Sequence, residues 1–166
     1  MKSSDLEYLY HWASNADFPL RRAPTAVGYS NKDIYFCWLK AIYRNGAFGG
    51  VRKTVVKDLR AQEILNQHEV VFSTVACFEP GTELGPHKDP PVYGIHYRRI
   101  QIPLYIPSND CYMIWRGEKV FWEEGVPQIY DVMDEVHEGY NYSDDDMLFL
   151  FVDIRKDNVN STLHEV

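Results

Sequence analysis

The sequence has no apolar segment long enough to span a membrane, and Met1 to Asp5 lack the apolar core of a signal peptide. Its three cysteines have no metal-ligand spacing and are typical of reduced core thiols. Only 17 lysines and arginines stand against 24 acidic residues, a net charge of −7, which argues against binding to a nucleic-acid backbone. These absences predict a cytoplasmic protein that binds neither nucleic acid nor a membrane. No pattern in the sequence fixes an oligomeric state.

Aromatic residues, by contrast, are plentiful: they make up 14% of the chain and include 12 tyrosines. Aromatic and β-branched side chains fit the half-buried surface of a sheet, so this composition favours β-structure. A chain of 166 residues is long enough to bury a substantial core within one domain. We therefore expect a single domain over residues 1–166.

Helical patterns are confined to residues 1–66 of this domain. Ser4 opens a capping box with the acid three residues later, which predicts a helix to about Asn15. Apolar residues at helical spacing predict a second helix over Lys32–Asn45 and a third over residues 54–66. We expect the helices to pack on the outer face of one sheet.

From residue 69 the pattern changes to short β-rich runs separated by glycine, proline, asparagine and aspartate. This spacing predicts a sandwich or jelly roll over residues 69–154, followed by a C-terminal tail over 155–166. The fold class is therefore α+β, mainly β. The predicted strands are Glu69–Phe78, Arg98–Ile106, Cys111–Arg116, Lys119–Trp122, Pro127–Asp131, His137–Tyr142 and Met147–Ile154.

Three residues have the pattern of a metal site. His87 and Asp89 lie two positions apart, so their side chains share one face of an extended backbone, and His137 follows on a later strand. Two imidazoles and one carboxylate leave three positions of an octahedron open, which is typical of non-haem Fe(II) sites that activate dioxygen. His96 and Glu83 remain competing candidates for the ligand set.

A second pattern concerns the strand over Arg98–Ile106. Arg99 and Gln101 share one face of this strand, and Ile100, Ile102 and Leu104 share the other. If the polar face lies inside a barrel, its guanidinium and amide suit an anionic ligand. The alternative is a polar face exposed to solvent on the outside of the sheet.

Together these motifs resemble the aspartyl/asparaginyl β-hydroxylase family of Fe(II)/2-oxoglutarate-dependent dioxygenases. The resemblance runs from about residue 70 to 154 and implies a double-stranded β-helix, a cupin-like jelly roll, in agreement with the strand pattern. The residues that carry it are Phe78-Glu79-Pro80-Gly81-Thr82, Pro86-His87, Arg98-Arg99-Ile100-Gln101, Trp122-Glu123-Glu124-Gly125, Tyr130-Asp131, Val136-His137-Glu138 and Leu150-Phe151-Val152-Asp153.

The resemblance implies roles for individual residues. His87, Asp89 and His137 match the catalytic iron ligands, a complete triad where the vertebrate members have lost the carboxylate. Arg99 matches the basic residue that approaches the cosubstrate near the metal. Gln101 stands where a histidine is more usual, so a polar contact to the cosubstrate is kept with altered chemistry.

The family holds the distal carboxylate of 2-oxoglutarate with an arginine ten residues after the second histidine and with a hydroxyl on an earlier strand. Here these positions are Met147 and Ala76, so both anchors are replaced together. The resemblance therefore implies a remodelled cosubstrate pocket, with Thr74 as a substitute hydroxyl and Arg98 or Arg99 as the nearest cation.

These observations predict an Fe(II)-dependent dioxygenase, most simply a 2-oxoglutarate-coupled hydroxylase of an amino-acid or peptidyl side chain. The substrate is either a small molecule or a peptide. Two alternatives stay open. One is an iron enzyme that uses a different cosubstrate. The other is a non-catalytic, metal-binding jelly roll that recognises a partner.

Overall fold

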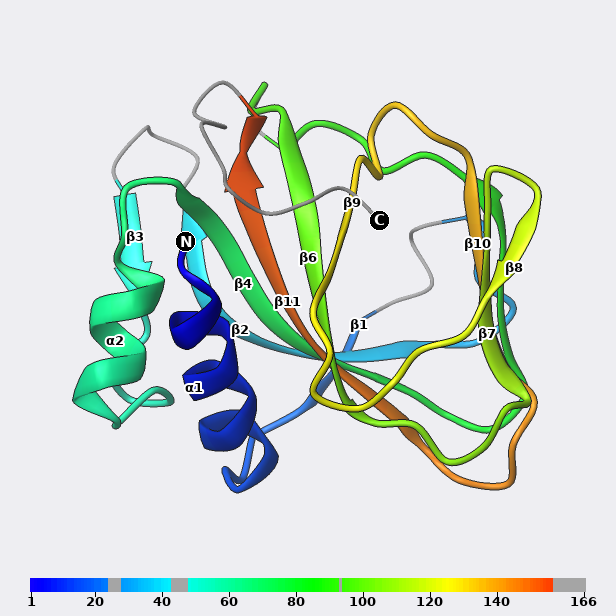
Figure 1. Ribbon diagram of the computed structural model, residues 1–166, viewed down its shortest axis with the longest axis horizontal. Helices are drawn as coiled ribbons and strands as arrows, with labels where there is room; N and C mark the ends of the chain where they lie inside the picture. The colour runs from blue at the N-terminus through cyan, green and yellow to red at the C-terminus, as the bar shows by residue number, and fades with distance from the viewer. Residues whose placement is uncertain (24–27, 43–47, 93, 157–166) are drawn as a thin grey trace.

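The computed structural model describes residues 1–23, 28–42, 48–92 and 94–156, which form two facing β-sheets and two helices (Figure 1). The smaller sheet has 4 strands, in the order β5 (Thr82–His87), β10 (His137–Asn141), β7 (Cys111–Trp115) and β8 (Glu118–Val120). The larger sheet has 7 strands, in the order β1 (Arg21–Ala23), β2 (Ile34–Ile42), β4 (Val70–Phe78), β11 (Met147–Arg155), β6 (Tyr97–Tyr105) and β9 (Gln128–Tyr130), with β3 (Phe48–Val51) paired to β2.

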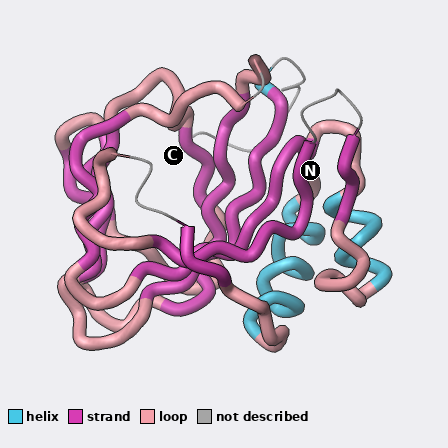
Figure 2. The backbone as a smooth tube through the Cα atoms, turned by 180° about the vertical axis from the view of Figure 1, so that it is seen from behind, coloured by secondary structure: helices cyan, strands magenta, loops and turns pink. Residues whose placement is uncertain are grey.

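The two helices, α1 (Ser3–Ser14) and α2 (Leu59–Leu65), lie on one side of the larger sheet, as predicted (Figures 1 and 2). Leu6 and Leu9 of α1 are buried in one cluster with Ile100 and Ile102 of β6. Burial of such side chains stabilises the fold by about 1.5–3 kcal/mol each. No helix in the described part of the chain is long and apolar enough to cross a membrane.

Both helix boundaries differ from the prediction. Helix α1 begins at Ser3 with Lys2 as its N-cap and has no side-chain capping bond, so the predicted capping box at Ser4 is wrong. Helix α2 is shorter than the predicted 54–66, because Asp58 caps it by accepting a hydrogen bond from the Ala61 amide at 2.7 Å.

The predicted helix over Lys32–Asn45 is wrong. Residues 34–42 form β2, which pairs with β4 in the larger sheet. Both faces of this strand carry apolar side chains. Phe36 borders the space between the sheets, and Cys37 and Leu39 pack beneath the helices. A short run that is apolar on both faces fits a helix or a buried strand, and here pairing with β4 decides between them. Residues 43–46, the predicted helix end, lie outside the described residues.

Every predicted strand from residue 69 onward is confirmed, as β4, β6, β7, β8, β9, β10 and β11. The hairpin between β7 and β8 turns at Arg116 and Gly117, whose φ values of 51° and 82° are the left-handed pair of a tight hairpin. Strand β5 was not predicted as a strand in its own right. Strands β1–β3 also make the N-terminal part less helical than expected, and residues 157–166 of the predicted tail lie outside the described residues.

Strand β11 is central to the larger sheet and buried on both faces, as its sequence predicts. Leu150 and Val152 point toward the helices, within the same cluster as Leu6. Phe149 and Phe151 border the space between the two sheets. The two faces of one strand therefore build the core on one side and a cavity on the other.

Candidate metal centre

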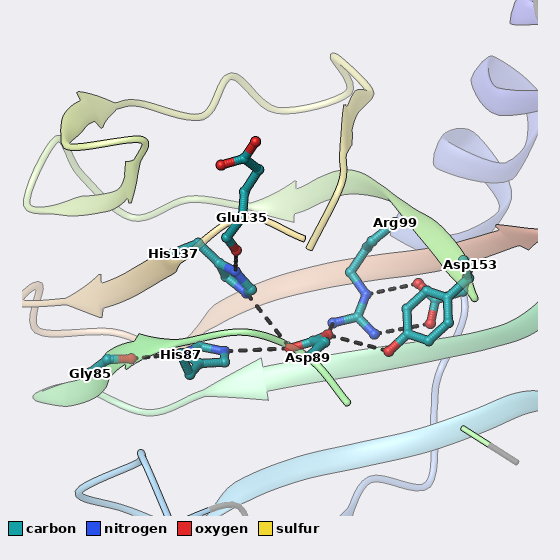
Figure 3. Close-up of polar contacts among 8 residues, drawn as sticks. Gly85, His87, Asp89, Arg99, Glu135, His137 and Asp153 are labelled. Atoms are coloured by element: carbon teal, nitrogen blue, oxygen red, sulfur yellow. Dashed lines mark hydrogen bonds and ion pairs between the residues drawn. The ribbon is translucent and has the colours of Figure 1, made fainter. Parts of the chain in front are cut away.

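His87, Asp89 and His137 meet between the two sheets (Figure 3). His87 is the last residue of β5, Asp89 lies two residues after it, and His137 opens β10 opposite His87 in the antiparallel register. One potential ligand atom from each side chain lies within 4.8 Å of the other two. Strand pairing thus brings together residues that are far apart in the sequence, as predicted.

The three donor atoms converge on one point. Asp89 Oδ1 lies 3.5 Å from Nε2 of His87 and 3.7 Å from Nε2 of His137. Donors bound to a small divalent cation lie about 2.1 Å from it, so adjacent donors are about 3 Å apart. These separations are only slightly wider. Within the described residues no other group of three potential metal ligands lies this close together. His96 and Glu83 do not belong to this group.

Each imidazole is oriented by a backbone carbonyl. Nδ1 of His87 lies 2.7 Å from the Gly85 carbonyl oxygen, and Nδ1 of His137 lies 3.1 Å from that of Glu135. A carbonyl only accepts hydrogen bonds, so Nδ1 of each ring donates to it and Nε2 is the nitrogen that faces the site. The Tyr29 ring stacks on His87 with centroids 3.6 Å apart and further restricts its orientation. Tyr29 was not anticipated from the sequence.

Arg99 connects the triad to a second carboxylate (Figure 3). Its Nη1 donates to Asp89 Oδ2 at 2.7 Å, while Nε and Nη2 donate to the two oxygens of Asp153 at 2.8 and 2.9 Å. Arg99 therefore fixes the carboxylate of Asp89 and leaves Oδ1 facing the histidines. Asp153 belongs to a motif that carries the family resemblance, but its pairing with Arg99 was not anticipated from the sequence.

The charges around Asp89 keep it ionised. Burial by itself would raise the pKa of Asp89, but the Arg99 guanidinium and the two imidazoles outweigh burial and lower it to about 2. Burial lowers the pKa of His137, and the nearby carboxylate of Asp89 only partly opposes this. A carboxylate and neutral imidazoles are the forms that bind a metal ion.

The Arg99 and Gln101 face of β6 borders the cavity, so the alternative of a solvent-exposed face is wrong. Gln101 is buried, and its Oε1 accepts a hydrogen bond from the indole of Trp122 at 2.9 Å. Thr74 is also buried at the cavity wall, and its hydroxyl donates to the Cys37 carbonyl at 3.0 Å. The partner of Gln101 was not anticipated.

The cavity beside the triad has a volume of about 210 Å³. Away from the metal ligands its wall is mainly apolar: Met147 lines it and belongs to one buried cluster with Ala76 and Phe149. Arg98 does not line this wall and pairs instead with Asp131 at 3.6 Å. The predicted loss of both usual anchors therefore coincides with an apolar end of the cavity.

A jelly roll that brings two histidines and one carboxylate together between its sheets is typical of mononuclear non-haem iron proteins. A model of the aspartyl/asparaginyl β-hydroxylase family matches residues 45–157, more than half of the chain. The chain belongs to this family, which confirms the resemblance read from its sequence and makes it a hydroxylase.

Solved structures of other proteins share this fold. A 2OG-Fe(II) oxygenase family oxidoreductase from Burkholderia pseudomallei is 12% identical with a TM-score of 0.57, and the match covers 93% of this chain and 92% of that one. A prolyl-4-hydroxylase from Pseudomonas putida is 13% identical with a TM-score of 0.52, over 93% and 88%. A predicted oxalate decarboxylase from Thermotoga maritima is 16% identical with a TM-score of 0.53, over 84% and 94%. At these identities the likeness shows the fold alone. No curated protein matches the chain.

Family membership together with the triad supports Fe(II) and 2-oxoglutarate as cofactors. The donor set fits Fe(II), since two imidazoles and a carboxylate occupy one side of the ion and leave its other positions open. The keto-acid end of 2-oxoglutarate suits those open positions. Its distal carboxylate fits less well, because no described residue at the cavity wall offers it a cation other than Arg99, which already binds two carboxylates.

Proposed function

We propose that this chain is an Fe(II)-dependent dioxygenase that hydroxylates a C–H bond of an amino-acid or peptidyl side chain. His87, Asp89 and His137 would hold the iron. The observation that carries this proposal is the convergence of the two Nε2 atoms and one carboxylate oxygen within 4.8 Å, in a chain that belongs to a family of hydroxylases. Bound Fe(II) would supply the redox chemistry with dioxygen.

The protein's own residues supply geometry and a sheltered site. The Gly85 and Glu135 carbonyls hold both imidazoles in the tautomer that binds metal, and Arg99 holds Asp89 ionised. These contacts hold the three ligand side chains in place in the metal-free protein, which reduces the conformational entropy lost when the metal binds. The apolar wall keeps water from the reacting groups.

Iron binding is tested first. Metal-free protein titrated with Fe(II) without oxygen should bind one ion per chain, and both His87→Ala and His137→Ala should abolish this binding. His96→Ala is the matched control, since His96 is exposed and lies outside the triad. Equal Fe(II) binding by all three variants would overturn the assignment of the ligands.

Catalysis is tested second. Iron-loaded protein supplied with oxygen and a 2-oxo acid should release carbon dioxide, and His87→Ala should not. A protein that binds Fe(II) but releases no carbon dioxide with any 2-oxo acid, in the presence of peptide and free amino-acid mixtures, would point instead to the non-catalytic, metal-binding jelly roll.

A further inference from the structure

The charges at the metal end of the cavity are already paired. Among the described residues that line the cavity, Arg99 is the only lysine or arginine. All three of its nitrogens donate to carboxylates, at 2.7 Å to Asp89 and at 2.8 and 2.9 Å to Asp153. The Arg99 guanidinium is therefore already paired with both acidic side chains. Apart from a bound metal, this end offers no positive charge to a second carboxylate of a ligand.

The opposite end of the cavity is apolar. Trp122 and Phe149 meet edge to face with centroids 4.8 Å apart, and Phe78 packs against Phe149 at 6.0 Å. Met147 is 3% exposed within the same cluster. A carboxylate placed against this wall would lose its hydration without gaining a counter-charge, at a cost of several kcal/mol in general. A methyl or methylene group would gain by the same burial.

The neutral polar groups between the two ends are few. The Thr74 hydroxyl donates to a backbone carbonyl, and Oε1 of Gln101 is occupied by Trp122. Nε2 of Gln101 makes no hydrogen bond to another described residue, so one neutral amide is left facing the cavity. A single amide can bond a polar ligand group but does not balance a full negative charge.

From these contacts we infer that the cavity prefers a 2-oxo acid with an uncharged, apolar tail over one that ends in a second carboxylate. This inference rests on the proposed function, since the keto-acid head is taken to lie at the iron. It assigns the tail to the wall formed by Met147, Phe149 and Trp122. The cosubstrate class is therefore the aliphatic 2-oxo monocarboxylic acids.

The reaction balances with such an acid. A 2-oxo acid R′–CO–COOH, dioxygen and a substrate R–H give R′–COOH, carbon dioxide and R–OH. One oxygen atom enters each of the two products R′–COOH and R–OH. Oxidative decarboxylation supplies two electrons and the substrate C–H bond supplies two, which together reduce one dioxygen. The charge of the tail R′ takes no part in this balance, so the tail is free to vary with the cavity.

The test compares two acids with the same head and nearly the same shape. In 5-methyl-2-oxohexanoate an isopropyl group replaces the distal carboxylate of 2-oxoglutarate. Each is titrated without oxygen into Fe(II)-loaded protein, and binding is followed by the visible absorption of the chelated 2-oxo acid and by the shift in Tm. The branched acid should bind about tenfold or more tightly than 2-oxoglutarate. Equal affinities, or tighter binding of 2-oxoglutarate, would overturn the inference.

A variant tests the same point from the side of the protein. Met147→Arg places a cation at the apolar end and should tighten 2-oxoglutarate binding by about tenfold or more while weakening the branched acid. Leu59→Arg is the charge control, because Leu59 is 73% exposed on α2, and should change neither affinity. A folded Met147→Arg protein without this gain would contradict the inference. If that variant does not fold, the comparison of the two acids on the natural protein decides.

Failure of this inference and failure of the proposed function give different results. The Fe(II) titration precedes the acids, so a protein that binds no iron contradicts the function itself. A protein that binds iron and 2-oxoglutarate tightly keeps the function and loses only the preference for an apolar tail.

Discussion

The two ends of the cavity are chemically opposite although one strand, β11, contributes to both. At the metal end β6 and β11 supply Arg99 and Asp153, which hold Asp89. At the other end β11 supplies Met147 and Phe149, packed in an apolar cluster. Residues of β11 that share one face thus change from a buried acid to a thioether within a few positions.

This difference shows which end of the cavity can accommodate a buried charge. At the metal end Asp89 has a cationic partner within hydrogen-bonding distance and stays ionised, whereas burial raises the pKa of Asp153 and its contact with Arg99 only partly opposes this. At the apolar end the described residues offer no such partner, and the wall is suited to hydrocarbon. We expect substitutions at the metal end to act through unpaired charge and those at the apolar end to act through lost packing.

The largest effect is expected from Arg99→Ala. This change leaves Asp89 and Asp153 buried without their shared cation and should lower the free energy of unfolding by about 4 kcal/mol. Urea denaturation of the metal-free protein measures it. Arg22→Ala is the control, because Arg22 is an exposed partner of Asp33 and should cost less than about 1 kcal/mol. Similar losses in both variants would remove the distinction between buried and surface pairs.

The next largest effect is expected from Phe149→Ala, which disrupts packing at the apolar end of the cavity. Phe149 is 1% exposed, and its truncation should lower the free energy of unfolding by about 3 kcal/mol through lost burial and an enlarged cavity. Fe(II) affinity should stay within about threefold, because the metal ligands are held by other contacts. Phe121→Ala, at 48% exposure, is the matched control for stability. A large loss of iron affinity in Phe149→Ala would show that the two ends are coupled.

Acid titration tests how much the ionised Asp89 carboxylate at the metal end contributes to stability. The pKa of Asp89 is about 2 in the folded protein, below its ordinary 3.8, so the ionised form stabilises the fold. This contribution, about 2 kcal/mol, is fully present above about pH 4 and is lost as the pH falls toward 2. Unfolding free energies of the metal-free protein measured across this range should show the loss. Asp89→Asn should show a flatter dependence, and an unchanged slope would contradict the assignment.

The smallest effect is expected where the two ends meet. Trp122→Phe removes the N–H that binds Gln101 Oε1 and should lower the free energy of unfolding by about 1 kcal/mol. Trp12→Phe is the control, since the Trp12 ring packs on Phe18 and its indole donates to no described residue. A loss in Trp122→Phe no greater than in the control would mean that this hydrogen bond adds nothing to stability.

The sequence predicted the β half of the fold better than the N-terminal part. Runs such as Met147–Ile154 are bounded by turn residues and too short for a helix, so their pattern has one reading. The run over Lys32–Asn45 is apolar on both faces and fits either structure, and its pairing with β4 is invisible in local sequence. Tertiary contacts therefore override helical spacing at β2.

The candidate site residues show the same contrast between local sequence pattern and tertiary contacts. The spacing of His87 and Asp89 on extended backbone placed two candidate ligands on one face, and a histidine on a later predicted strand supplied the third, His137. Asp153 and Tyr29 carried no such local signal, because their roles depend on strands and loops that approach from elsewhere in the fold.

The sequence by itself determined the strand pattern and the residue types of the candidate ligands, because these depend on residue identity and short-range spacing. Its resemblance to the family predicted that Met147 and Ala76 replace both usual anchors. Only the tertiary structure decided that Arg99 pairs with Asp89 and Asp153 and that Met147 lies in an apolar wall. Charge pairing and burial depend on which side chains meet across two sheets, and that is fixed by strand register rather than by any local pattern.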